Sequence, residues 1–361
     1  MKLKELLAAL VLITCLVGCG DDDTPDLILQ VPTTYVSASY EANVTVEATV
    51  INELAAMTSA ANSAEAGAQG AENISAIDHP GTLSSVTLPS YRKLVADWLV
   101  ELVAAANSPT GFQNPGTGSP EEGEEGGLLG SRLLDENGLE LEQMVEKGAF
   151  GAALYNHALT VINGDLSDAS AIDQLVEIHG TSPTFDPSKT TAAATYSRRR
   201  SNQNTETGFF YDIRTALITA RAAIEGGSAF EAERDQALAD YLLAWEKSNF
   251  ATVIYYCNST KVQLQEAGKD PAALGNAMHA YAEGVAFAHG FRGLSNKMIT
   301  DAQIDRVLEL LLASAGQTPE SYRFLNDATL LGNLDQIVTD LQAIYGFTDE
   351  EINTFYVNDP T

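Results

Sequence analysis

Apolar side chains recur at three- and four-residue spacing along most of this chain of 361 residues, and this periodicity limits the fold more than any other feature. Residues with that spacing share one face of a helix, so the pattern predicts helices that each bury one side. A two-residue alternation, typical of strands, is expected only over residues 26–36. We therefore predict an all-α fold, a multi-helix bundle of about seven or more helices with long loops. The expected helices cover residues 44–62, 90–107, 139–162, 171–178, 208–226, 228–259, 270–290, 300–311, 331–344 and 348–355.

The amino terminus has the pattern of an export signal. Two lysines precede an apolar run over residues 6–17, which is too short to span a bilayer comfortably. The run ends in LVGC at residues 16–19, which resembles the bacterial lipobox. That resemblance implies that Cys19 is diacylated, which anchors a protein stably without a membrane-spanning helix. We expect residues 1–18 to be a lipoprotein signal peptide and the protein to be an outer membrane lipoprotein that faces the periplasm or the cell surface.

An acidic run, GDDD at residues 20–23, follows the cysteine directly. It resembles the surface-export signal of lipoproteins in some Gram-negative bacteria, and it fits a solvated tether equally well. We expect residues 19–34 to form an acidic tether or linker and residues 35–361 to form one helical domain. Within that domain, residues 108–138 are rich in Gly, Pro and Glu, which predicts a long loop that is either a mobile excursion or a functional lid.

The formal net charge of −29 argues against nucleic acid as a partner, because phosphate binding needs a basic face. The expected partners are the membrane, through the lipid anchor, and an envelope protein or a small ligand. The three arginines at residues 198–200 are expected to pair with carboxylates of their own domain. Cys257, alone far downstream of the signal segment, is expected to be a buried small hydrophobe.

The segment over residues 270–293 carries an unusual strip of small and polar side chains. Projected at about 100° per residue, its large apolar side chains fall on two flanks. The strip between them holds His279 and Glu283 among Gly and Ala. A solvent-facing strip usually carries several Lys, Arg and Glu, so this one predicts a central helix whose strip faces a tight interior seam. The expected helix over 139–162 has a similar strip, with Glu142 and Glu146 beside small residues.

Two chemical interpretations of this seam are open. His279 and Glu283 lie one turn apart and could supply two ligands to a divalent metal such as iron or zinc, with Glu142 or Glu146 as a third. Alternatively, Glu283 accepts a hydrogen bond from His279 and the pair satisfies itself in the interior.

The other histidines are not expected to join this site. His289 lies about 15 Å further along the same helix axis. His157 shares a helix face with Glu146 but lies three turns from it. His79 and His179 have loop-like surroundings and are expected to be exposed.

Three blocks in order support a family resemblance: EQMVEKG at residues 142–148, AWEKS at 244–248 with the tyrosines that follow, and NAMHAYAEG at 276–284. They resemble the domain-of-unknown-function family 4856 of bacterial lipoproteins over about residues 35–315. That family has no established activity to carry over. It is similar in style to the imelysin-like lipoproteins, which are helical proteins linked to iron uptake. Their hallmark His and Glu are three residues apart, whereas here the spacing is four.

Familiar catalytic patterns are missing from the sequence. It contains no His-Glu-x-x-His, no Gly-x-Ser-x-Gly, no Walker loop and no Gly-x-Gly-x-x-Gly motif. The first functional hypothesis is therefore a non-enzymatic, lipid-anchored binding or accessory protein. The second is an envelope metal-binding protein with an imelysin-like role, centred on His279 and Glu283. The third is a metallohydrolase that uses the same pair.

Overall fold

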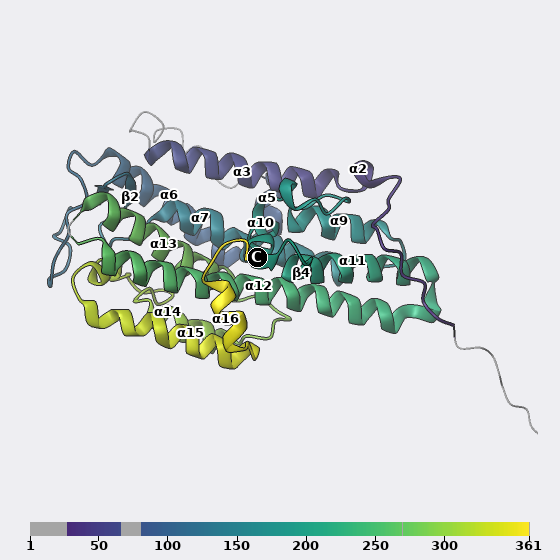
Figure 1. The fold of residues 1–361 in the computed structure, drawn as a ribbon. Helices are drawn as coiled ribbons and strands as arrows, with labels where there is room; N and C mark the ends of the chain where they lie inside the picture. The colour runs from purple at the N-terminus through teal and green to yellow at the C-terminus, as the bar shows by residue number, and fades with distance from the viewer. Residues whose placement is uncertain (1–26, 66–80, 269, 361) are drawn as a thin grey trace, which may run out of the picture. The chain divides into compact units, whose positions relative to one another are not determined.

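The structure, a computed structural model, describes residues 27–65, 81–268 and 270–360 (Figure 1). The expected signal peptide at 1–18, the lipidation site Cys19 and His79 lie outside the described residues. Residues 31–361 form one compact unit. Within the described part, no helix combines the length and apolar character needed to cross a bilayer.

The first half of the compact unit alternates helices with one hairpin. Its elements are α2 (Tyr40–Asn43), α3 (Thr45–Glu65), α5 (Gly81–Val86), α6 (Pro89–Asn107), β1 (Gly127–Leu129), β2 (Arg132–Leu134), α7 (Leu141–Ala149), a π-helical segment (Phe150–Tyr155), α8 (Asn156–Ile162), α9 (Ser170–His179), a 3-10 turn (Pro187–Lys189) and α10 (Ala192–Arg199). The sequence did not predict α2, α5 or α10.

The second half holds the longest helices. Its elements are β3 (Ser201–Asn202), β4 (Thr207–Gly208), α11 (Phe209–Gly226), a 3-10 turn (Ser228–Phe230), α12 (Glu231–Glu266), α13 (Pro271–Gly290), α14 (Asp301–Leu310), two 3-10 segments (Ser321–Leu325 and Ala328–Leu330), α15 (Leu331–Tyr345) and α16 (Asp349–Phe355). The strands pair only as two short antiparallel hairpins, β1–β2 and β3–β4. The fold is therefore all-α, a multi-helix bundle, as predicted.

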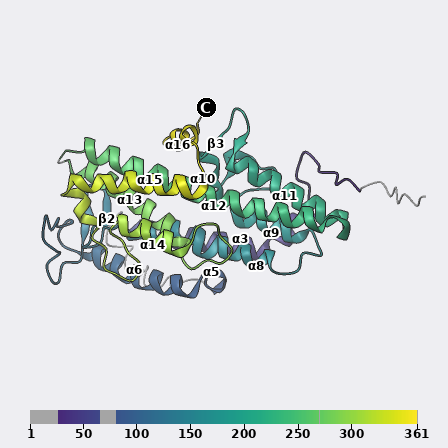
Figure 2. The same ribbon diagram turned by 90° about the horizontal axis from the view of Figure 1, so that it is seen from below.

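Helix α12 is the axis of the compact unit. It packs along α11 over its first half and along α13 over its second half, and α13 packs in turn against α7 (Figures 1 and 2). Large aromatic side chains fill the centre, because they bury the most apolar area for each residue. The largest wholly buried side chains include Trp245, Tyr155, Tyr241, Tyr281 and Phe210.

Local signals explain several helix starts. The Asp270 carboxylate accepts a hydrogen bond from Ala273 N at 3.2 Å and so caps α13, whose first residue is a proline. The capping box expected at Thr300 is present, because its side chain and that of Gln303 exchange bonds with each other's backbone. The capping box expected at Ser228 is absent. Ser228 lies in a 3-10 turn instead, and α12 begins at Glu231.

Two expectations about extended and loop segments are corrected. Residues 27–36 form no strand. The stretch 108–138, expected to be a loop, contains the β1–β2 hairpin, and its end is packed into the domain, since Leu134 and Asp135 are buried. A Cβ on Gly275 of α13 would lie 2.1 Å from Leu129 O. The hairpin therefore lies directly against α13, and its position depends on a glycine in that helix.

The predicted helix over 139–162 is helical throughout but changes form in the middle, from α7 to the π-helical segment to α8. The change occurs where the chain crosses the end of α13. A Cβ on Gly290 would lie 2.2 Å from Gly148 O, and a Cβ on Gly151 would lie 2.6 Å from Gly290 O. The backbones thus approach more closely than any larger residue allows. The expected small-residue seam between these two helices is present.

Candidate functional site

A cavity of about 560 Å³ opens between α7, α10, α12 and α13, and we call it the polar pocket. Side chains that carry charge or an amide make up most of its wall: Asn62, Arg132, Glu142, Gln143, Glu146, Lys147, Arg199, Gln263, Asn276, His279, Glu283 and Asn358. Tyr196, Tyr255 and Tyr256 add phenol rings. The pocket thus combines hydrogen-bond donors, acceptors and aromatic faces.

The structure brings together all four residues that the sequence singled out. Glu142 and Glu146 reach the pocket from α7, and His279 and Glu283 reach it from α13. Glu142 and Glu283 are buried, whereas His279 and Glu146 keep part of their side chains exposed. The packing of α13 against α7 through small residues creates this meeting.

His279 is paired with Glu140 more closely than with Glu283. Its Nδ1 lies 2.7 Å from Glu140 Oε2, whereas its Nε2 lies 3.9 Å from Glu283 Oε2. The alternative in which Glu283 accepts a hydrogen bond from His279 is therefore wrong, because the carboxylate at hydrogen-bonding distance is that of Glu140. Glu140 is fully buried, and Arg132 Nη1 lies 3.7 Å from its other oxygen. A buried carboxylate held between the Arg132 guanidinium and the His279 imidazole anchors the histidine from outside its own helix.

Sequence reasoning missed Glu140 for a geometric reason. The predicted helix began at Leu139, and a helical projection from there points Glu140 away from the strip of Glu142 and Glu146. In the structure α7 begins at Leu141, and Glu140 has an extended backbone with φ −82° and ψ 99°. Because Glu140 lies just outside the helix, a projection at helical spacing does not apply to it.

A buried ammonium lies among the pocket carboxylates. Lys147 Nζ pairs with Glu146 and lies 3.7 Å from Glu283 Oε1. It also lies 5.7 Å from the centre of the Tyr196 ring. Burial by itself lowers the pKa of Lys147, but the neighbouring carboxylates Glu146, Glu283 and Glu142 outweigh it and hold that pKa above its usual value. Lys147 is therefore a fixed positive charge.

Lys147 was also absent from the sequence-based site. It lies four residues after Gln143 and so shares a helix face with it, but the sequence singled out neither residue. Both side chains line the pocket.

Glu283 is held from several sides. Tyr196 Oη donates to Glu283 Oε1 at 3.4 Å, and the Tyr256 phenol lines the same pocket. Burial is the largest cause that raises the pKa of both tyrosines well above the usual value, and the negative charge of Glu283 adds to it. Both phenols therefore remain protonated, and the Tyr196 bond ties α10 to α13.

One buried acceptor in the pocket has no partner. The Gln143 amide nitrogen donates to Glu142 Oε2, which leaves Gln143 Oε1 aimed away from that bond. Gln143 is buried, and no hydrogen bond reaches its Oε1 from the described residues. Buried polar atoms without a partner are uncommon and costly. This oxygen is a point at which a ligand could donate a hydrogen bond.

The described residues include no group of three or more His, Cys, Asp or Glu side chains placed to hold a metal ion. The local geometry gives a reason. The Lys147 ammonium lies between Glu146 and Glu283, and the Gln143 amide binds Glu142. The four carboxylate and imidazole groups share one pocket, but they do not converge on one point.

The remaining histidines lie elsewhere. His157 Nε2 lies 3.3 Å from Glu47 Oε1, away from the pocket. His179 was expected to be exposed, but it is wholly buried, and its ring centre lies 4.7 Å from that of Trp245. Burial lowers the pKa of His179 to about 3. Burial also lowers the pKa of His289 to about 4.

The arginine cluster and the cysteine are structural. Arg198 pairs with Asp359, but Arg200 donates to Phe355 O and the Asn358 side chain, so carboxylate pairing holds for only part of the cluster. Arg199 lines the polar pocket. Cys257 is buried as predicted, and burial raises its pKa to about 12.

No protein-family model, curated protein or solved structure matches the chain.

Proposed function

We propose that the chain is a lipid-anchored, non-enzymatic protein of the cell envelope, and that its helical domain binds a small polyhydroxylated ligand in the polar pocket. The lipobox-like LVGC at residues 16–19 supports the anchor and an outer-membrane location. The resemblance to family 4856 of bacterial lipoproteins is consistent with both, and it assigns no activity.

The observation that carries the ligand proposal is Gln143 Oε1, a buried acceptor without a partner in a pocket of about 560 Å³. Ligand sites combine a closed shape with a few polar groups that fix orientation, and a volume of this size suits a small molecule. An apolar ligand would leave the acceptor unsatisfied. A ligand that donates a hydrogen bond would satisfy it.

The charges in the pocket narrow the ligand class. The pocket balances three carboxylates, those of Glu142, Glu146 and Glu283, against three cationic side chains, those of Arg132, Lys147 and Arg199, so its formal charge favours neither an anion nor a cation. A hydroxyl group both donates and accepts, so several hydroxyls can bond to carboxylates, amides and cationic side chains at once. The ring face of a sugar can also pack on a phenol ring such as that of Tyr256. A carbohydrate-like ligand fits these groups best.

A panel of neutral sugars and polyols tests the proposal. Thermal unfolding and calorimetric titration of the full-length protein would be measured with glucose, galactose, mannose and their disaccharides. We expect at least one to raise the melting temperature and to bind. Gln143→Leu, which keeps the size but removes the acceptor, should weaken that binding about tenfold or more, since an unmade buried hydrogen bond costs about 1–3 kcal/mol.

The matched control is Gln336→Leu, which makes the same change on the exposed face of α15. It should leave binding unchanged. If no member of the panel binds, or if Gln143→Leu binds as the parent does, the carbohydrate-like ligand is wrong.

A metal-binding role is the second candidate, supported by the presence of Glu142, Glu146, His279 and Glu283 in one pocket. It requires these side chains to rearrange around Lys147. Metal content and thermal stability of the parent and of His279→Ala test it. Stoichiometric iron or zinc that is lost in the variant would favour metal binding, with an imelysin-like uptake role next to examine. A metallohydrolase that uses His279 and Glu283 would also need a bound metal, so the same measurement tests that hypothesis.

A further inference from the structure

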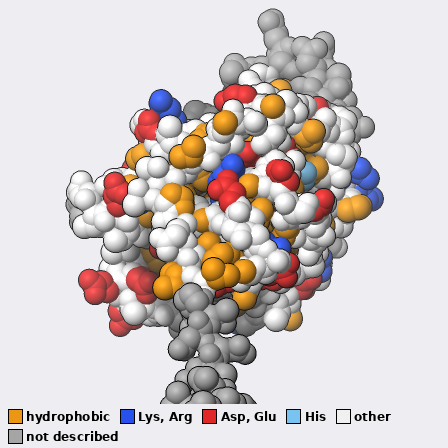
Figure 3. All heavy atoms as spheres, turned by 90° about the vertical axis from the view of Figure 1, so that its right-hand side faces the viewer, with side chains coloured by type: hydrophobic (Ala, Val, Ile, Leu, Met, Phe, Trp, Pro, Cys, Tyr) orange, Lys and Arg blue, Asp and Glu red, His pale blue; other side chains and the backbone are white. Residues whose placement is uncertain are grey.

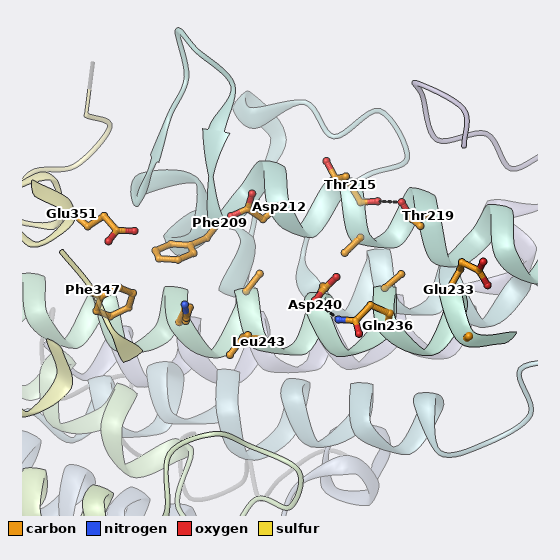
Figure 4. A pocket seen from close by; sticks show the side chains of 15 residues that line it. Phe209, Asp212, Thr215, Thr219, Glu233, Gln236, Asp240, Leu243, Phe347 and Glu351 are labelled. Carbon is orange, nitrogen blue, oxygen red and sulfur yellow. Dashed lines mark hydrogen bonds between the residues drawn. The ribbon is translucent and has the colours of Figure 1, made fainter. Parts of the chain in front are cut away.

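A second cavity, of about 860 Å³, runs along the outside of α11 and α12 and ends at α16 (Figure 4). We call it the α11–α12 groove. None of its lining residues belongs to the polar pocket. On α12 it extends from Ala232 to Lys247, which at helical rise is a length of about 22 Å.

The floor of the groove is apolar. Small side chains, Ala216 of α11 with Ala237 and Ala244 of α12, keep it shallow and smooth. Leu243 of α12 also lines the floor and is 37% exposed, so its side chain is available to an apolar partner. At one end Phe209 and Phe347 face the groove (Figure 4), with ring centres 6.3 Å apart.

The walls of the groove are acidic. The groove is lined by four carboxylates, those of Asp212, Glu233, Asp240 and Glu351, and by one ammonium, that of Lys247, so its formal charge is −3. Asp212 and Glu233 are exposed, and neither carboxylate forms a hydrogen bond or ion pair with another side chain among the described residues. Partial burial raises the pKa of Asp212, although the Lys247 charge opposes this. Both carboxylates are therefore open to a cationic partner.

We propose that the α11–α12 groove is a docking site for a basic amphipathic helix of a partner protein. An apolar floor between acidic walls complements a helix with leucine-like side chains on one face and lysine or arginine on its flanks. Glu233 and Asp240 are seven residues apart, two turns of helix, which matches basic residues at the same interval on a helix lying alongside.

Charge also argues against a second copy of this chain as the occupant. The chain carries a formal net charge of −29, and acidic side chains are spread over the face shown in Figure 3, where basic ones are few. Bringing such a surface into an acidic groove sets like charges against each other, which costs free energy. The groove therefore calls for a partner of opposite charge.

A model peptide tests the docking site directly. The probe is a fluorescent 14-residue helix of leucine and lysine, about 21 Å long, with its leucines on one face. Its binding to the full-length protein would be followed by fluorescence anisotropy. Glu233→Lys with Asp240→Lys should weaken binding about tenfold or more, because two attractive contacts become repulsive. Leu243→Ser should weaken it as well.

The matched control is Glu266→Lys with Glu309→Lys, which makes the same charge change at two exposed positions that do not line the groove. It should alter binding less than twofold, as expected for distant screened charges. Circular dichroism would check that each variant is folded. Equal weakening by both double variants, or equal binding of a peptide with serine in place of leucine, would mean that the peptide only senses net charge and would overturn the docking site.

Discussion

His279 Nδ1 lies 2.7 Å from Glu140 Oε2, a carboxylate 139 residues earlier in the chain that is completely buried. Glu283, one helical turn along from His279, lies further from it, at 3.9 Å. This bond ties α13 to the residue that precedes α7. One face of the polar pocket is thus fixed by a contact between segments that are far apart in sequence.

The first prediction concerns this pair. In a double-mutant cycle with Glu140→Ala and His279→Ala, we expect a coupling free energy of about 1–3 kcal/mol, since a short contact to a buried charge is lost in each single variant. The corresponding cycle with Glu283→Ala and His279→Ala should give a smaller coupling, because of the longer distance. Urea denaturation of the four proteins in each cycle measures both values. A larger coupling to Glu283 would contradict the assigned pairing.

The second prediction concerns the crossing of α13 and α7. We expect Gly290→Ala to lower the free energy of unfolding by about 1–3 kcal/mol or more, because its Cβ would lie 2.2 Å from Gly148 O. The obstructing atom belongs to the backbone, so the helices have to move apart. Thermal or urea unfolding measures the loss.

Gly332→Ala on α15 is the control for that change, since nothing lies within 4 Å of a Cβ there. Alanine is the better helix former, so this variant should be more stable than the parent by about 0.5–1 kcal/mol. If both alanine variants behaved alike, close backbone approach at Gly290 would not be the reason for its small size.

The third prediction is a pH dependence from Asp135 in the 108–138 stretch. Burial raises its pKa from 3.8 to about 8, while Asn137 N and Leu139 N donate to its Oδ1. Between these two pH values the folded state binds a proton that the unfolded state does not. The stabilising contribution of Asp135 is therefore full below pH 3.8 and is lost as the pH rises to about 8.

Asp135→Asn keeps the accepting oxygen and removes the titration. Its stability relative to the parent should rise with pH, by up to about 1.4 kcal/mol for each pH unit, and should level off above the folded-state pKa. Urea unfolding from acid to mildly alkaline pH measures the difference. Asp235→Asn, at an exposed carboxylate on α12, should show no such trend, and a flat difference for Asp135→Asn would contradict the buried, protonated state.

The sequence alone determined the helices and the faces that they turn toward each other. The long helices follow from the 3.6-residue repeat and from local caps such as Asp270 and the Thr300 box. The strips on 139–162 and 270–290 likewise predicted which two helices meet and which four polar residues share a pocket. These features depend on neighbours within one or two turns, so the pattern of residue types is sufficient to predict them.

Only the tertiary structure decided how the polar groups pair. It assigns Glu140 to His279 and places the Lys147 ammonium between Glu146 and Glu283, and it buries His179 under Trp245. Each of these depends on how separate helices are positioned in three dimensions. The two-residue difference between the predicted start of this helix, Leu139, and its actual start, Leu141, moves Glu140 off the helical projection, and no local pattern encodes which distant side chain will lie within hydrogen-bonding distance of it.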